Sequence, residues 1–156
     1  MIKKLMPLIL WIVVFQLVGY GIGYLTQANI PIWYQSLQKS TINPPQIIFP
    51  IVWTCLYVML AITGWYLWVH QNRPRGQIIL SLYFVQMLMN WAWTPLFFQF
   101  HLIQLGFYWI LIMIIITIIL IIMTKKQFAL ACYLLIPYCL WLFFAGYLNW
   151  VIWMKN

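Results

Sequence analysis

The side chains that could do chemistry in this chain are mainly aromatic rings, amides and hydroxyls, because its 156 residues include eleven Trp and no Asp or Glu. A protein without carboxylates has no carboxylate general acid or base, no hard-cation site built from carboxylates, and no acidic proton relay in a membrane. Its aromatic and amide groups can stack on a flat molecule and hydrogen-bond its polar edge. Composition therefore favours binding of a flat, mostly apolar ligand over carboxylate catalysis.

Aromatic and amide side chains recur at helical spacing in three segments, so in each segment they share one face of a helix. A side-chain amide in hydrocarbon is costly unless it is hydrogen-bonded, so Asn90 must face a neighbouring helix or a polar ligand group. On residue types alone, core packing is the more frequent reason for such stripes, and a bond between helices is the favoured role of Asn90. The three faces are Phe49, Trp53 and Tyr57; Gln86, Asn90, Trp93 and Phe97; and Trp141, Ala145, Leu148 and Asn149.

The composition is that of an integral membrane protein. Only 5% of the residues are charged and the mean hydropathy is +0.97, whereas a soluble domain carries roughly 25% charged residues. The net charge of +8 comes from small basic groups between apolar runs. Since they form no basic face or stripe, nucleic acid is excluded as a partner.

Five apolar segments are long enough to cross a bilayer, which takes about 20 residues. We therefore expect an all-α membrane protein, with residues 1–156 forming a single domain built as a five-helix transmembrane bundle. A short turn is expected at 99–101, between the third and fourth helices. The expected helices span about 5–26, 46–69, 77–98, 102–123 and 128–153.

The longest connection, 27–45, is expected to contain a short helix outside the membrane. Ile30, Trp33, Tyr34 and Leu37 recur there at helical spacing. The segment would either anchor in the membrane interface or cover the mouth of the bundle as a lid.

Basic residues predict the orientation, because they concentrate on the cytoplasmic side of membrane proteins. Six fall on the side of the N-terminus and two on the other. We expect a multi-pass protein of a bacterial cytoplasmic membrane, with the N-terminus inside and the C-terminus outside. The six are Lys3, Lys4, Arg73, Arg75, Lys125 and Lys126, and the two are Lys39 and Lys155.

Small and metal-ligating residues leave several alternatives open. Gly19 and Gly23 form a Gly-x-x-x-Gly pair that permits close helix approach, either within the bundle or in a dimer. Cys132 and Cys139 could share a helix face, but small buried side chains are the favoured interpretation. The two histidines lie at membrane edges, so haem ligation is disfavoured and no metal site is expected.

Four sequence motifs then point to a family, and this chain resembles the TspO/MBR family, the tryptophan-rich sensory or translocator proteins. The resemblance runs from about Gly19 to Asn156, and the motifs keep the family's order and spacing. The matching residues are Trp33, Tyr34, Leu37 and Lys39; Pro44, Pro45, Phe49, Trp53 and Tyr57; Asn90, Trp93, Pro95, Phe97 and Phe98; and Pro137, Tyr138, Trp141, Phe144, Ala145, Leu148 and Asn149.

The resemblance implies five helices, often a homodimer, and a pocket that opens toward the first loop. It implies a receptor or carrier for porphyrin-type tetrapyrroles such as protoporphyrin and haem, bound as ligands with no cofactor required. It also implies an alternative, light-dependent porphyrin breakdown at two tryptophans that match Trp53 and Trp141. The ligand-binding positions it implies are Tyr34, Pro45, Phe49, Trp53, Tyr57, Asn90, Trp93, Trp141, Ala145 and Leu148.

Some positions depart from the family pattern. Pro50 follows Phe49 directly where the family has Gly-Pro, a change that could alter the bend beside the pocket. The family's sterol motif is not intact near the end of the fifth helix, so sterol recognition is not expected. Lys39 is the expected partner of ligand propionates. A third alternative is a regulator or assembly partner without a ligand, whereas ion-coupled transport is disfavoured because no intramembrane charge exists for coupling.

Overall fold

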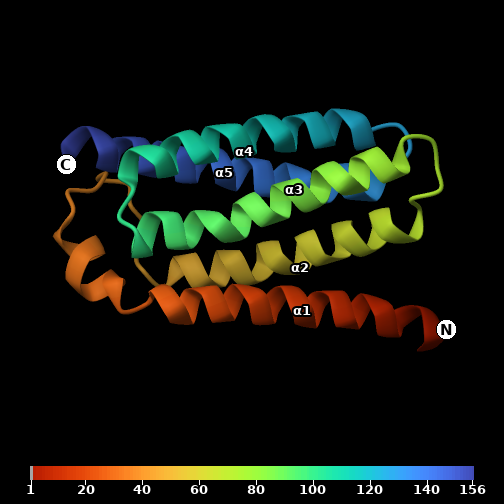
Figure 1. Cartoon of the computed structure of the whole chain (residues 1–156), viewed down its shortest axis with the longest axis horizontal. Helices are drawn as coiled ribbons and strands as arrows, with labels where there is room; N and C mark the ends of the chain where they lie inside the picture. Colours follow the sequence, from red (N-terminus) through yellow and green to blue (C-terminus); the bar gives the residue numbers. More distant parts are fainter. Residues whose placement is uncertain (1) are drawn as a thin grey trace.

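The computed structural model describes residues 2–156 as a bundle of five long α-helices (Figure 1). Two five-residue π-helical turns, η1 (Ile30–Tyr34) and η2 (Pro95–Gln99), follow the first and third of them. The five expected helices are confirmed, and most of their ends shift by one to four residues. The helices are α1 (Ile2–Thr26), α2 (Ile48–Val69), α3 (Gly76–Thr94), α4 (Ile103–Thr124) and α5 (Ala129–Lys155).

The helix lengths and compositions are those of a multi-pass membrane protein. Four helices, α1 from Met6 onward, α2, α4 and α5, are long and apolar enough to cross a membrane. The shorter α3 is outside this set, and it carries the buried Gln86 and Asn90. These two amides bond to tyrosine hydroxyls of neighbouring helices, so α3 is the fifth helix of the bundle despite its lower hydropathy.

The boundary expected at the end of α3 is wrong by four residues. The α-helix ends at Thr94 instead of continuing to about 98. Pro95 has no N–H to donate to the preceding turn. The five residues that begin with it, Pro95–Gln99, wind as a π-helical turn, in which the Phe100 N–H donates to the Pro95 carbonyl (3.0 Å). His101, with φ of 56°, then reverses the chain into α4.

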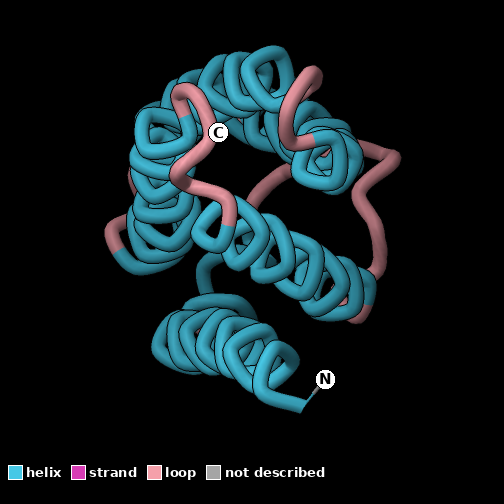
Figure 2. The backbone as a smooth tube through the Cα atoms, turned by 90° about the vertical axis from the view of Figure 1, so that its right-hand side faces the viewer, coloured by secondary structure: helices cyan, strands magenta, loops and turns pink. Residues whose placement is uncertain are grey.

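α1 lies at the margin of the bundle, as the end-on view of Figure 2 shows for the helix that carries the N-terminus. It packs mainly on α2 and touches α3 and η2. Glycines permit this close packing: a Cβ on Gly64 would overlap the ring of Trp11, and a Cβ on Gly19 would overlap the ring of Tyr57. α1 is therefore held to α2 at these two levels.

The connection between α1 and α2 covers one end of the bundle as a lid. Tyr34 is buried with Phe97 of η2 and Ile152 of α5, and the ring of Trp33 stacks on His101 with centroids 4.1 Å apart. The apolar side chains of this connection thus pack against η2 and α5. Of the two alternatives for this segment, the packing favours the lid, although its helical part is a π-helical turn.

Hydrogen bonds hold the lid in place. The Gln38 N–H donates to Oδ1 of Asn156 (3.0 Å), and Nδ2 of Asn156 donates to the Gln38 carbonyl (3.1 Å). The hydroxyls of Ser40 and Tyr147 share a third bond of 3.2 Å. These contacts connect the lid to α5.

Candidate functional site

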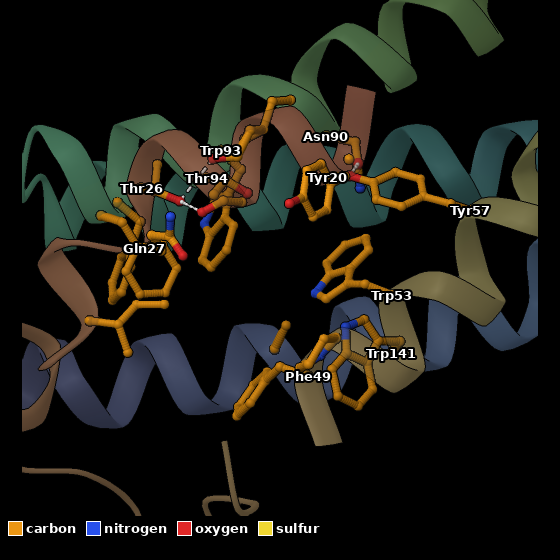
Figure 3. Close-up of a pocket in the computed structure, with 18 of the residues that line it drawn as sticks. Tyr20, Thr26, Gln27, Phe49, Trp53, Tyr57, Asn90, Trp93, Thr94 and Trp141 are labelled. Carbon is orange, nitrogen blue, oxygen red and sulfur yellow. Dashed lines mark hydrogen bonds between the residues drawn. The ribbon is translucent and has the colours of Figure 1, made fainter. Parts of the chain in front are cut away.

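A cavity of about 770 Å³ lies beneath the lid, with lining residues on all five helices, η2 and the lid. Its walls are mostly aromatic and aliphatic. Figure 3 shows Trp53 of α2 and Trp141 of α5 on one side and Trp93 of α3 on the other, with open space between them. This volume lies within the range of about 300–1,000 Å³ that small-molecule sites occupy.

Nine of the ten predicted ligand positions line this cavity, and the tenth does not. Pro45 lies outside the lining, and its neighbour Gln46 lines it instead. The Pro45 carbonyl accepts the Ile48 N–H (2.9 Å), so this proline starts the turn that leads into α2. The nine lining residues are Tyr34, Phe49, Trp53, Tyr57, Asn90, Trp93, Trp141, Ala145 and Leu148.

Two aromatic pairs shape the wall where α2 faces α5. The ring of Phe49 meets Trp141 edge to face, with centroids 6.1 Å apart. Trp53 tilts over Tyr57, with centroids 5.5 Å apart. Such pairs add about 0.5–1.5 kcal/mol beyond the area that they bury, so they hold these rings in place at the cavity.

Two buried polar atoms on cavity-lining residues have no hydrogen-bond partner within the described protein. They are the indole Nε1 of Trp141 and Oδ1 of Asn149. An unsatisfied buried polar group costs about 1–3 kcal/mol. A ligand whose polar edge reached either atom would recover part of that cost.

Asn90 braces three helices with its amide. Its Oδ1 accepts the Tyr57 hydroxyl (3.2 Å) and its Nδ2 donates to the Tyr138 hydroxyl (3.0 Å). Nε2 of Gln86 donates to the same Tyr138 hydroxyl (3.0 Å). The favoured alternative, a bond between helices, is therefore confirmed for Asn90, although this residue also lines the cavity.

The face of α1 toward the cavity was not identified from the sequence. Gln16, Tyr20, Tyr24 and Gln27 line the cavity, as does Gly23. A signal was present, because glutamine and tyrosine at spacings of three and four within an apolar helix mark one polar face. α1 is therefore a wall of the site as well as a membrane anchor.

The cavity wall is uncharged: none of the described residues that line it is Lys, Arg or His. Lys39, the expected partner of ligand propionates, lies outside the lining. Its ammonium donates to the carbonyls of Gln35 (3.2 Å) and Leu37 (3.0 Å) and lies 4.7 Å from the Tyr34 ring centroid. Burial lowers the pKa of Lys39 from its ordinary value. A role of Lys39 as the partner of ligand propionates stays a prediction.

The remaining predicted residues serve packing or lie apart from the cavity. Gly19 lets Tyr57 approach α1 within the chain, whereas Gly23 has no atom within 4 Å of the place of a Cβ. Cys132 and Cys139 are buried free thiols. The two histidines do not line the cavity. Dimerisation through the glycine pair stays a prediction.

Comparison with known proteins agrees with this architecture. The sequence profile of the TspO/MBR family matches residues 7–154. The chain is 35% identical to the translocator protein of Bos taurus, over 80% of this chain and 75% of the relative. It is 30% identical to the tryptophan-rich protein TspO of Chlorobaculum tepidum, over 99% of this chain and 98% of the relative. It is also 30% identical to the tryptophan-rich protein TspO of Archaeoglobus fulgidus, over 89% of this chain and 90% of the relative. This chain therefore belongs to the TspO/MBR family.

Proposed function

We propose that this protein is a membrane receptor or carrier that binds porphyrin-type tetrapyrroles, such as protoporphyrin or haem, in the cavity beneath the lid. The observation that carries the proposal is the aromatic cavity of about 770 Å³, with indole rings from three helices in its wall. Flat macrocycles gain stacking and area burial from such rings. Family membership supports the same ligand class.

The uncharged wall constrains how such a ligand sits. The macrocycle would lie among Trp53, Trp93 and Trp141, while its propionates would stay at the mouth. Gln27 and Gln46 line the cavity, are exposed, and can donate amide N–H groups to carboxylates. This arrangement avoids burying an unpaired carboxylate, which is highly unfavourable.

We also propose that the N-terminus is cytoplasmic in a bacterial cytoplasmic membrane. Figure 1 shows the N-terminus at one end with the α2–α3 and α4–α5 connections, and the lid and the C-terminus at the other. The end with the N-terminus carries most of the basic residues. A C-terminal reporter that is active only outside the cytoplasm should be active, and an inactive, well-expressed fusion would reverse this orientation.

The test of ligand binding is a titration of protoporphyrin into purified protein in the dark, followed by tryptophan fluorescence. We expect saturable quenching, because the macrocycle would lie against three indoles. A lipid sample without protein and a denatured sample serve as controls for partitioning. Quenching that rises linearly with protoporphyrin and never saturates would overturn the tetrapyrrole proposal.

A second candidate function is light-dependent breakdown of the bound porphyrin, with dioxygen as the oxidant. The placement of Trp53 and Trp141 in the wall of one cavity favours it. After saturation in the dark, the sample is illuminated in air and the porphyrin spectrum is followed. Spectral loss that depends on both tryptophans would support breakdown. A stable spectrum, or loss equal to that of free porphyrin, would leave binding as the function.

A further inference from the structure

Between α1 and α2, the cavity wall is exposed on its outer side toward the lid end of the bundle. Two contacts attach α1 to α2 before this opening: Nε2 of Gln16 donates to the Thr54 carbonyl (2.9 Å), and Gly19 lies against the ring of Tyr57. From there to the lid, residues of both helices line the cavity and are also exposed on the outer surface. On α1, the exposed fractions are 64% for Leu17, 74% for Tyr20 and 62% for Tyr24.

A side chain that lines a cavity and is also exposed outside lies at an opening. On α1, Gln16, Tyr20 and Tyr24 are four residues apart and form a row along one face. On α2, Pro50 and Thr54 are likewise four apart, exposed, and part of the lining. We call the gap between these two rows the α1–α2 slot.

The α1–α2 slot faces lipid, because both of its rows lie within apolar membrane spans, Met6–Thr26 and Ile48–Val69. We infer that this slot is a lateral portal through which a flat ligand dissolved in the bilayer reaches the cavity. The inference rests on the proposed ligand-binding function and adds the route and the phase from which the ligand comes.

Glycine keeps the slot open. Gly23 lines the cavity and is exposed, and no atom lies within 4 Å of the place of its Cβ. Beside it, the rings of Tyr20 and Tyr24 stack with centroids 6.4 Å apart and planes 25° from parallel. They form a flat rim along which a macrocycle can pass, and a larger side chain at Gly23 would project into its path.

The route through the lid is less favourable. It requires the two hydrogen bonds between Gln38 and Asn156 to break and the buried Tyr34 to leave Phe97. The slot requires no such rupture. None of the described residues that form the slot or the cavity wall is charged. The portal therefore suits molecules that partition into lipid. Any carboxylates on such a molecule would stay at the lid end, outside the apolar part of the cavity.

The test compares Gly23→Leu with Gly21→Leu in proteoliposomes. Gly21 is the matched control: it also has open space around its Cβ position, but it does not line the cavity. Protoporphyrin is added to the vesicle lipid, and tryptophan quenching is followed by rapid mixing. We expect Gly23→Leu to slow association and release alike, by about tenfold or more, since a plugged path raises both barriers equally. Gly21→Leu should match the wild type.

Two further variants distinguish passage through the slot from misfolding and from passage through the lid. Gly23→Ala adds one methyl group to the same site and should slow both rates less than leucine does, which controls for misfolding. Asn156→Ala loosens the lid and should leave both rates unchanged. The rate should follow the mole fraction of protoporphyrin in the lipid.

Three results would overturn the portal while equilibrium quenching still saturates. The first is wild-type kinetics in Gly23→Leu. The second is weaker equilibrium binding with an unchanged association rate, which would make Gly23 part of the wall only. The third is faster association in Asn156→Ala, which would assign passage to the lid. An absence of saturable quenching in the wild type would instead overturn the proposed ligand class itself.

Discussion

The side-chain amide of Asn156 pairs with the backbone of Gln38 through two hydrogen bonds, of 3.0 and 3.1 Å. It joins the end of α5 to the lid, 118 residues away in sequence. The pairing satisfies one backbone N–H and one carbonyl that would otherwise depend on water. The lid is thus fixed to the helix that carries Trp141.

Asn156→Ala should loosen the lid without unfolding the bundle. Each lost bond contributes about 0.5–1.5 kcal/mol, so hydrogen exchange of the Gln38 amide should accelerate several-fold. Met154→Ala is the control, because Met154 is exposed. Equal exchange in both variants would show that the amide pair does not hold the lid.

Asn90→Ala should destabilise the protein more than Asn149→Ala does. The first change removes the partner of the Tyr57 hydroxyl and a donor to Tyr138. The second removes an amide whose Oδ1 has no partner. Since each orphaned buried group costs about 1–3 kcal/mol, thermal unfolding in detergent should separate the two variants clearly. If Asn90→Ala weakened only ligand binding, its bracing role would be refuted.

Trp53→Phe and Trp141→Phe should each weaken protoporphyrin binding, because phenylalanine offers a smaller ring to the macrocycle. Loss of about 0.5–1.5 kcal/mol of stacking corresponds to roughly two- to tenfold in the dissociation constant. Trp68→Phe is the matched control on α2, since Trp68 is exposed and does not line the cavity. Equal affinities in all three variants, measured by equilibrium titration, would remove the two tryptophans from the site.

The lid should lose packing at high pH through Tyr34. Burial raises the pKa of Tyr34 above its ordinary value, more than its bond to Asn43 lowers it. The stabilisation from the neutral phenol is therefore complete below a pH of about 10 and is lost as the pH rises through the folded-state pKa. The phenolate absorbance that disappears in Tyr34→Phe should have its midpoint above a pH of about 10. A midpoint at or below the ordinary value would show that the ring is not buried.

Much of this protein could be predicted from patterns within single segments. Apolar length predicted the five helices, and helical spacing placed Phe49, Trp53 and Tyr57 on one face, which does line the cavity. Spacing also identified the apolar side of the lid. These predictions succeed because the spacing of residues within one helix decides which side chains share a face. They also succeed because a bilayer disfavours unbonded polar groups, so polar side chains of a membrane helix face the interior of the bundle.

Other features depend on how the helices meet, which no segment specifies alone. The packing of α3 beside α2 and α5 puts Asn90 within hydrogen-bond distance of two tyrosines, one on each helix. The path of the chain before α2 leaves Pro45 outside the cavity lining, and the ammonium of Lys39, also outside the lining, donates to carbonyls of the lid.

The sequence by itself determined a five-helix membrane bundle with three aromatic faces, since the composition and the helical spacing can be read from each segment alone. It left open whether the 27–45 connection is a lid or an interface anchor, and the packing decided for the lid. Only the tertiary structure decided that α1 forms a wall of the site and that Tyr20, Gly23 and Tyr24 border an opening beside α2. Gly19 and Gly23 share one motif and look alike in the sequence, yet one receives the ring of Tyr57 and the other borders open space. That difference arises from how α1 packs against α2, which depends on contacts between residues far apart in the chain.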